Sequence, residues 1–270
     1  IQAGDKAASA QMSALKGQKK ILAEELSFER VNQAATEADR LRAQNRLAQG
    51  DKAGARASLD AALARQSGNV PAMMTLARLD GLDGKPAQAR QRLDALVKAE
   101  PQNLQARLAL VEVDRQLGAP DAALVAQLKD AVRVNPSNPA PHLMLVERLL
   151  AGGDGAAALG AAQDASAALP NDLAVMDALG RAQIVGGDSA RAVSTFKRLA
   201  ALQPKNPMPL ARLADAHLAG KDKAAAATAL RQALAIEPDH LLSQRGLALL
   251  ALDDKRQPEA LAIARSIQKC

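Results

Sequence analysis

Apolar side chains recur three and four positions apart along most of this chain, in short blocks that glycine, aspartate and proline separate. An α-helix turns once every ~3.6 residues, so this spacing places the apolar side chains on one face of a helix. Residues 70–103 hold two such faces, on either side of a turn at 81–84. Their members are Met73, Leu76 and Ala77 before the turn and Ala89, Leu93 and Leu96 after it. The pattern predicts a pair of amphipathic helices joined by a tight turn.

The same helix pair returns along the chain with a period of 34 or 35 residues. Glycines mark its turn at Gly50, Gly84, Gly118, Gly153 and Gly187, and prolines mark its end at Pro101, Pro136, Pro170, Pro204 and Pro238. Repeats of this length form solenoids, because one helix pair cannot bury both of its apolar faces and stacks on its neighbours. We therefore expect an all-α array of about seven repeats, at residues 36–69, 70–103, 104–138, 139–172, 173–206, 207–240 and 241–270, the last one incomplete.

Residues 1–35 match the repeat less well than the rest of the chain. Their composition still favours helix, so we predict an N-terminal helical segment that belongs to a degenerate repeat. Residues 18–48 hold few helix-breaking residues, and a single long helix across them is an alternative. Because the chain begins with Ile1 and its last repeat is incomplete, we interpret it as a piece of a longer protein.

The composition favours helices and argues against two kinds of partner. Hydrophobic residues make up 48% of the chain and aromatic residues only 1%, so the predicted core is aliphatic and rich in alanine, the best helix former. The net charge of +6 comes from 35 basic and 29 acidic residues spread along the chain. Nucleic-acid binding needs a basic stripe or stacking aromatics, so we expect none. No apolar run reaches the ~20 residues of a membrane span, and we expect no span either.

No set of residues has the spacing of a catalytic or metal site. The single cysteine, Cys270, leaves no pair for a disulfide or a zinc motif, and we interpret it as incidental. His142, His217 and His240 fall in different repeats, so we expect no metal site. The glycine-rich turn at 152–155 lacks the Lys-Ser/Thr that follows a phosphate-binding loop. We therefore predict that the chain is not an enzyme and binds no cofactor.

A leucine followed by a small or short residue precedes each turn, at Leu76-Ala77, Leu110-Val111, Leu145-Val146, Leu179-Gly180, Leu213-Ala214 and Leu247-Ala248. Together with the 34-residue period and the closing proline, these residues resemble the tetratricopeptide repeat over residues 36–270. The resemblance implies a right-handed α-α superhelix whose first helices line a concave inner surface. The chain departs from the family pattern at its aromatic positions: Met73, His142, Met176 and Leu210 replace tryptophan, and Asp80, Asp114 and His217 replace tyrosine.

Three stretches resemble a narrower family, the tetratricopeptide proteins of the PEP-CTERM/exosortase system (the PrsT family). They are LARLDGLDGKPAQARQRLDAL at 76–96, MDALGRAQIVGGDSARAVSTFKRLAALQP at 176–204, and EALAIARSIQK at 259–269. This resemblance implies a non-catalytic protein-interaction scaffold in bacterial exopolysaccharide export or PEP-CTERM protein sorting. It places the protein in the periplasm or cell envelope, with a cytoplasmic location left open. Two alternatives are a periplasmic segment of another outer-membrane polysaccharide exporter and the repeat part of a larger enzyme.

The tetratricopeptide resemblance also implies which side chains line the groove, in two rows along the first helices. One row is Gln44, Arg78, Glu112, Glu147, Arg181, Asp215 and Leu249, and the other is Arg40, Met74, Leu108, Leu143, Asp177, Ala211 and Arg245. The candidates for holding an extended peptide are Arg40, Gln44, Arg78, Glu112, Glu147, Asp177, Arg181, Arg212, Asp215 and Arg245. The alternative is that these charges solvate the groove and pair between neighbouring helices.

Overall fold

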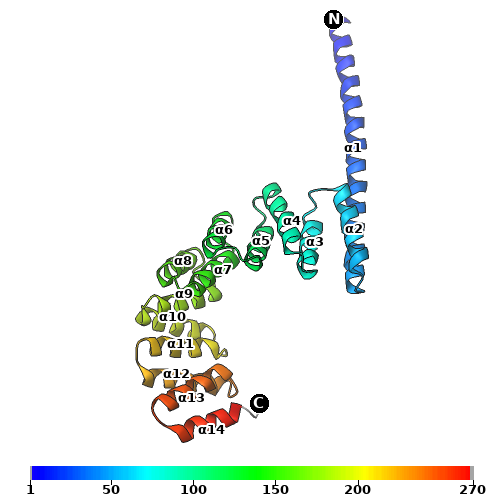
Figure 1. The fold of residues 1–270 in the computed structure, drawn as a ribbon. Helices are drawn as coiled ribbons and strands as arrows, with labels where there is room; N and C mark the ends of the chain where they lie inside the picture. Colours follow the sequence, from blue (N-terminus) through cyan, green and yellow to red (C-terminus); the bar gives the residue numbers. More distant parts are fainter. Residues whose placement is uncertain (1, 268–270) are drawn as a thin grey trace. The chain divides into compact units, whose positions relative to one another are not determined.

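The computed structural model of the chain describes residues 2–267, with side chains described for residues 18–258 and 260–265. Every regular element in this range is an α-helix (Figure 1). The helices are α1 (Gln2–Ala48), α2 (Lys52–Arg65), α3 (Val70–Leu82), α4 (Pro86–Ala99), α5 (Leu104–Gln116), α6 (Asp121–Val134), α7 (Pro139–Ala151), α8 (Gly155–Ala168), α9 (Leu173–Val185), α10 (Ser189–Leu202), α11 (Met208–Ala219), α12 (Lys223–Ile236), α13 (Leu241–Asp253) and α14 (Gln257–Ile267). The prediction of an all-α fold is confirmed, and Cys270 lies outside the described residues.

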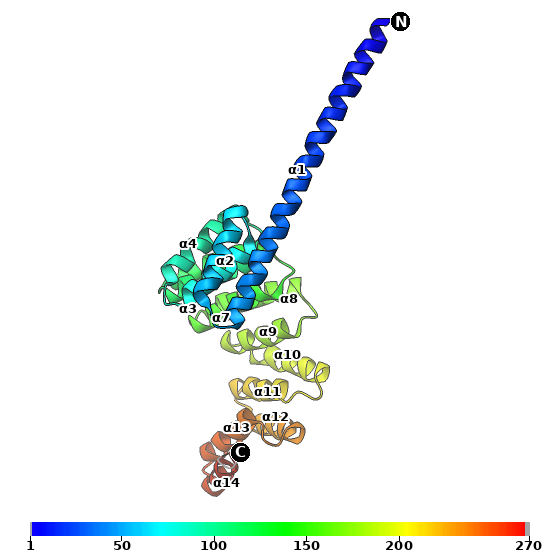
Figure 2. The same ribbon diagram turned by 90° about the vertical axis from the view of Figure 1, so that its right-hand side faces the viewer.

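The first helix is much longer than the others. α1 runs without a break from Gln2 to Ala48, so it continues across residue 35, where the sequence pattern places a boundary. α2 packs along the C-terminal end of α1, as both ribbon views show (Figures 1 and 2). Side chains 18–31 of α1 are all exposed. The N-terminal segment and the first helix of the first repeat are therefore one continuous helix.

Acidic and amide side chains begin most of the shorter helices. The side chains of Asn69, Asn103, Asn138 and Asp172 accept hydrogen bonds from backbone N–H groups at the starts of α3, α5, α7 and α9. Asp51, Asp154, Asp188 and Asp222 do the same for α2, α8, α10 and α12. Each cap satisfies a donor that has no partner inside the helix and stabilises the helix by about 1 kcal/mol. Short polar residues thus set where the helices start.

The turn between the two helices of a repeat needs a left-handed backbone residue. Gly50, Gly84, Gly118, Gly153 and Gly187 all have positive φ, between 70° and 82°. Lys221 (φ 63°) and Lys255 (φ 61°) occupy the next two places in the same 34-residue phase. The turn geometry therefore repeats where the glycine is lost, although it costs a side-chain-bearing residue about 1 kcal/mol or more.

By their contacts the helices form two parts, which we call the N-terminal part (residues 1–118) and the C-terminal part (residues 119–270). Apart from the long helix α1, we call the helix before each turn a first helix. The first helices are α3 and α5 in the N-terminal part, and α7, α9, α11 and α13 in the C-terminal part. α7 packs on α9 and α9 packs on α11, so these first helices lie side by side. Figure 2 shows the helices from α9 to α14 following one another in layers.

The core between the helices is aliphatic, as the composition predicts. Alanines at Ala55, Ala89, Ala158, Ala192 and Ala226 are completely buried. They let neighbouring helices approach closely because they carry no bulky side chain. Phe196 is also completely buried, and a Cβ on Gly180 would lie 2.4 Å from its ring, so only glycine leaves room for the ring there. Each repeat is held together mainly by this close packing.

Buried ion pairs support the N-terminal part. Asp80 in α3 is completely buried, and its carboxylate accepts hydrogen bonds from Arg56 of α2 at 2.6 Å and from Arg92 of α4 at 2.8 Å. Asp114 of α5 is almost completely buried, and Arg90 of α4 donates to it at 2.5 Å. These aspartates stand where the family pattern has tyrosine, so a charged network replaces a ring between the helices.

Candidate functional site

The candidate residues lie on first helices and on α1. Arg40 and Gln44 belong to α1, Arg78 to α3 and Glu112 to α5. In the C-terminal part, Glu147 belongs to α7, Asp177 and Arg181 to α9, Arg212 and Asp215 to α11, and Arg245 to α13. The structure joins some of these residues to one another and leaves others apart.

A ladder of ion pairs joins five candidates of the C-terminal part. Arg181 pairs across the helices with Glu147 and lies 2.8 Å from Asp177 on its own helix. Arg212 continues the ladder, with 3.7 Å to Asp177 of the preceding first helix and 3.7 Å to Asp215. The hydrogen bond with Glu147 raises the pKa of the Arg181 guanidinium above its usual value. We call this set the ladder; its charges on α7, α9 and α11 pair with one another.

Asp215 ends the ladder in a mixed environment. Burial in the groove raises the pKa of its carboxyl above the usual value, although 54% of its side chain is exposed. The neighbouring Arg212 guanidinium opposes this effect and favours the charged carboxylate. Asp215 is therefore the ladder residue whose charge is least well compensated.

The candidates of the N-terminal part do not form a ladder. Arg40 pairs with Glu37 one turn earlier on α1, and Glu112 accepts two hydrogen bonds from Arg115 and one from Gln116, both on its own helix. Among the described residues, Arg78 has no ion pair. The hydrogen bonds from Arg115 lower the pKa of the Glu112 carboxyl below its usual value. Arg78 of α3 and Glu112 of α5 belong to neighbouring repeats, and they form no ion pair with each other.

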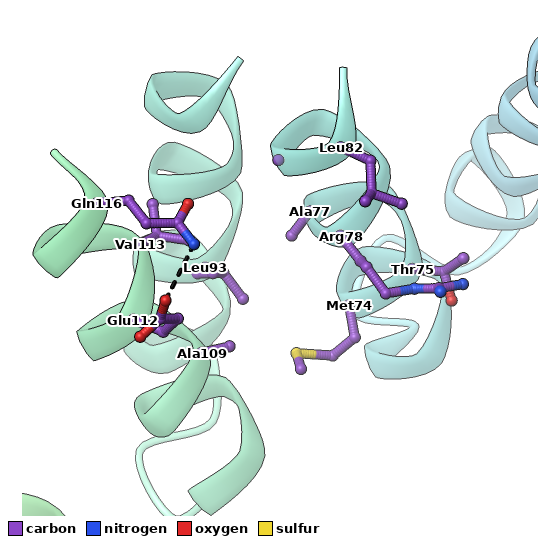
Figure 3. A pocket seen from close by; sticks show the side chains of 11 residues that line it. Met74, Thr75, Ala77, Arg78, Leu82, Leu93, Ala109, Glu112, Val113 and Gln116 are labelled. Atoms are coloured by element: carbon purple, nitrogen blue, oxygen red, sulfur yellow. Dashed lines mark hydrogen bonds between the residues drawn. The ribbon is translucent and has the colours of Figure 1, made fainter. Parts of the chain in front are cut away.

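A cleft of about 510 Å³ opens between α3 and α5, above α4. Its floor is apolar, and its edge carries Arg78 and Thr75 on one side and Glu112 and Gln116 on the other. The apolar lining residues are Met74, Ala77, Leu82, Leu93, Ala109 and Val113. Figure 3 shows Met74, Leu93 and Val113 around the gap between the helices, with the Arg78 side chain turned away from Glu112 toward Thr75. We call this the α3–α5 cleft.

A smaller cleft of about 260 Å³ lies at the same place of the repeat between α11 and α13. Arg212, Asp215 and Arg245 line it together with apolar residues that include Leu218, Leu230 and Leu249. Arg245 has no ion pair among the described residues. The C-terminal part therefore carries the ladder on α7, α9 and α11 and a cleft beside Arg245.

The repeat register explains why the α3–α5 cleft is open and the α9–α11 contact is closed. A shift of 103 residues carries each lining residue to its equivalent. Met74 corresponds to Asp177, Ala109 to Arg212, Leu93 to Phe196 and Ala77 to Gly180. Between α9 and α11 the contact therefore contains an ion pair, Asp177 with Arg212, and the buried ring of Phe196. At the same places between α3 and α5, Met74 and Ala109 cannot form an ion pair and Leu93 carries no ring.

The apolar members of the cleft were not among the sequence candidates. Met74 lies in one of the two predicted groove rows, but only polar residues of those rows were selected. Ala109 and Val113 lie one position away from the rows. Their signal is the comparison with one other contact, where Arg212 stands at the place of Ala109 and Phe196 at the place of Leu93. Charged positions alone do not indicate this site, because most of the residues that line the cleft are apolar.

The histidines have ordinary structural partners. The His142 ring lies 2.9 Å from the carbonyl oxygen of Pro136, and the His240 ring lies 2.8 Å from the hydroxyl of Ser243. His217 is within 4.0 Å of Asp222. Across residues 2–267, no three of the described His, Cys, Asp or Glu side chains gather as metal ligands would. In the same range no helix combines the length and apolar character needed to cross a bilayer.

Comparison with known proteins agrees with this geometry. A family profile described as "Tetratricopeptide repeat" matches residues 74–139, 143–207 and 211–270, which is more than half of the chain. The chain therefore belongs to the tetratricopeptide repeat family, whose helix pairs act as scaffolds for protein–protein interaction. No curated protein matches it.

Several solved structures share the fold. A tetratricopeptide repeat protein from Parabacteroides merdae has a TM-score of 0.63 at 12% identity, covering 87% of this chain and 93% of that one. YrrB, described as a protein with an unusual peptide-binding site, has a TM-score of 0.54 at 18% identity over 69% of this chain and 96% of its own. MamA has a TM-score of 0.52 at 18% identity over 62% of this chain and 91% of its own. At these identities the likeness establishes the fold alone.

Proposed function

We propose that this chain is a non-catalytic scaffold that binds extended segments of other proteins on the groove face of its first helices. The observation that carries the proposal is the α3–α5 cleft, an apolar space of about 510 Å³ with a polar edge that the chain's own side chains leave unfilled. Pockets of this size that combine an apolar floor with a few polar groups are the usual form of binding sites. YrrB, which shares the fold, is described as having a peptide-binding site of its own.

The proposed setting is the bacterial envelope, in exopolysaccharide export or PEP-CTERM protein sorting. The support for this setting is the resemblance of residues 76–96, 176–204 and 259–269 to the tetratricopeptide proteins of that system. Cell fractionation tests it: an antibody against the chain should detect the protein in the periplasmic or envelope fraction. Detection in the cytosolic fraction alone would contradict the envelope setting and leave the scaffold proposal standing.

Peptide selection tests the scaffold proposal directly. A phage-displayed library of random peptides would be selected against the purified chain, and the enriched peptides measured by fluorescence anisotropy. We expect the double variant Arg78→Glu/Arg181→Glu to weaken binding, because both residues lie on the groove face. The matched control is Arg198→Glu/Arg231→Glu, which reverses two exposed arginines on the second helices α10 and α12. A library that yields no binding peptide would overturn the proposal.

A further inference from the structure

We propose that the α3–α5 cleft binds a partner segment in which a bulky aliphatic side chain stands beside an aspartate or glutamate. The aliphatic side chain enters the space between α3 and α5, and the carboxylate pairs with Arg78. This inference rests on the proposed function and goes further, because it names the place and the chemistry of the partner.

The apolar part of the inference follows from the lining of the cleft. Met74 and Leu82 of α3, Leu93 of α4 and Val113 of α5 offer carbon atoms and no hydrogen-bonding groups. Leu82 is 64% exposed and Met74 and Val113 are half-buried, so their surface faces solvent, while Leu93 is buried at the floor. Covering it with an aliphatic side chain removes apolar area from water, at about 25 cal/mol for each Å². A polar side chain would lose its own hydration there without gaining a partner.

The charged part of the inference follows from which charged side chains at the edge of the cleft have ion-pair partners. Glu112 is already neutralised by Arg115, which donates to it at 2.6 and 2.9 Å, and it also accepts from Gln116 at 3.0 Å. Arg78 has no carboxylate within ion-pair distance among the described residues, and its side chain is exposed. The edge therefore carries one uncompensated positive charge. A carboxylate on the partner segment supplies the group that Arg78 lacks, and a guanidinium holds a carboxylate with two parallel hydrogen bonds.

The polar groups of the edge suit an extended backbone better than a compact ligand. The Gln116 amide nitrogen is bonded to Glu112, which orients its carbonyl oxygen as an acceptor for a backbone N–H. Thr75 donates its hydroxyl proton to the carbonyl oxygen of Pro71 at 2.7 Å, and its oxygen remains an acceptor. Figure 3 shows Gln116 on α5 and Thr75 on α3, where Thr75 lies beside the Arg78 guanidinium. A segment lying between them can bond to both walls while one side chain points to the floor.

The chain itself provides a way to close the cleft. Met74→Asp and Ala109→Arg introduce the residues that stand at the equivalent places, Asp177 and Arg212, where they form an ion pair. This closing variant uses a pairing that the same fold already accommodates. Its matched control is Ala87→Arg, which adds an arginine at an exposed position of α4 outside the cleft. Because Arg78→Glu changes only an exposed side chain, it serves as a second test that does not threaten folding.

The experiment is the selection of random displayed peptides described above, with enriched peptides measured on the wild type and on each variant. We expect enriched peptides to combine Leu, Ile or Met with a neighbouring Asp or Glu. Their affinity should fall about ten-fold or more in the closing variant and in Arg78→Glu, and stay unchanged in Ala87→Arg. A peptide whose acidic residue is replaced by lysine should bind Arg78→Glu better than the wild type.

Three outcomes would overturn the inference. Peptides that bind the closing variant as well as the wild type, but lose affinity in Arg181→Glu or Arg212→Glu, would keep the scaffold function and place the site elsewhere. Enriched peptides without an acidic residue, or insensitive to Arg78→Glu, would refute the named chemistry. Failure to select any peptide would refute the inference together with the proposed function.

Discussion

The contact between α3 and α5 and the contact between α9 and α11 stand at the same place of the repeat, yet one is open and the other is closed. Between α9 and α11, Phe196 fills the interior and Asp177 lies 3.7 Å from Arg212 at the groove surface. Between α3 and α5 the equivalent residues are Leu93, Met74 and Ala109, and a cleft of about 510 Å³ remains. The difference shows that equivalent helix contacts of one repeat protein can be closed or open, because different side chains stand at the same places.

The two regions also place their charges differently. The N-terminal part has ion pairs with buried carboxylates, at Asp80 with Arg56 and Arg92 and at Asp114 with Arg90. In the C-terminal part the equivalents of Asp80 are the uncharged or neutral residues Leu149, Gln183, His217 and Ala251. The first helices of this part carry the ladder on the groove face instead. Buried pairs contribute to stability only while both partners are present, whereas a half-exposed ladder contributes little. The following predictions test this comparison.

We expect the largest difference in stability between substitutions of Phe196 and of its equivalent Leu93. Phe196→Ala should destabilise the chain by about 3–5 kcal/mol, because it empties a fully buried site beside Gly180. Leu93→Ala at the equivalent place should cost about 2 kcal/mol, since an open cleft already adjoins it. Urea unfolding followed by circular dichroism at 222 nm measures both. Equal losses would mean that the cleft does not relieve packing at Leu93.

The buried network of the N-terminal part should have the next largest effect. Asp80→Asn should cost about 2–3 kcal/mol, because it leaves Arg56 and Arg92 facing each other without the carboxylate that holds them. Gln183→Ala, at the equivalent place of α9, should cost about 1 kcal/mol, since it removes one hydrogen bond from Thr195. The same unfolding measurement applies to both. A loss at Asp80 no larger than at Gln183 would refute the importance of the buried charges.

The ladder should contribute less than the buried network. Arg181→Ala should destabilise the chain by about 0.5–1 kcal/mol, because its partners Glu147 and Asp177 are partly exposed and water screens their ion pairs. Arg78→Ala should leave stability unchanged, since Arg78 has no ion pair among the described residues. Added salt should shrink the effect of Arg181→Ala. A salt-independent loss would indicate packing of the Arg181 stem instead.

The turns allow a stabilising change. Lys221→Gly should raise the free energy of unfolding by about 0.5 kcal/mol, because Lys221 has a φ of 63° that glycine adopts without strain. Gly187→Lys at the preceding equivalent turn should lower the free energy of unfolding, since a lysine adopts the φ of 82° of Gly187 only with strain. The space around the Cβ position is open, so no steric clash adds to this cost. Thermal unfolding of both variants provides the measurement. Destabilisation by Lys221→Gly would show that the lysine side chain has a role of its own.

The smallest effect concerns pH. Glu112 and Asp215 are equivalent residues whose pKa values shift in opposite directions, lowered by Arg115 for Glu112 and raised by burial for Asp215. Glu112 contributes stability that is present above its unfolded pKa and lost as pH falls through its lowered folded pKa. Asp215 contributes stability that is present below its unfolded pKa and lost as pH rises through its raised folded pKa. Unfolding free energies of Glu112→Gln and Asp215→Asn between pH 3 and pH 7 should therefore diverge from the wild type in opposite ways.

The glycine pattern illustrates how far local reasoning reaches. It locates the turns at Gly84, Gly118, Gly153 and Gly187, because each needs a left-handed residue that glycine adopts most easily. It does not extend to Lys221 and Lys255, where the same backbone conformation persists without glycine. The neighbouring helices hold the turn in shape at those two places. Helix pairs and their register could therefore be predicted even where single residues depart from the rule.

Less of the candidate site could be predicted from the sequence. The groove rows follow from the register, so Arg78, Glu112, Glu147 and Arg181 could be placed on first helices. Their pairing could not be predicted, because Glu147 and Arg181 join across helices while Glu112 turns back to Arg115. The choice depends on the separation of the helices, which several side chains between them set together.

The sequence by itself determined the helices, their turns and the 34-residue register, because apolar spacing, caps and left-handed turn residues act within a few positions of the chain. Only the tertiary structure decided which helix contacts are filled and which stay open. That outcome depends on how side chains from different helices fit together, such as the Phe196 ring against Gly180 compared with Leu93 beside Ala77. No single residue carries that information, so the cleft becomes visible only when the helices are in place.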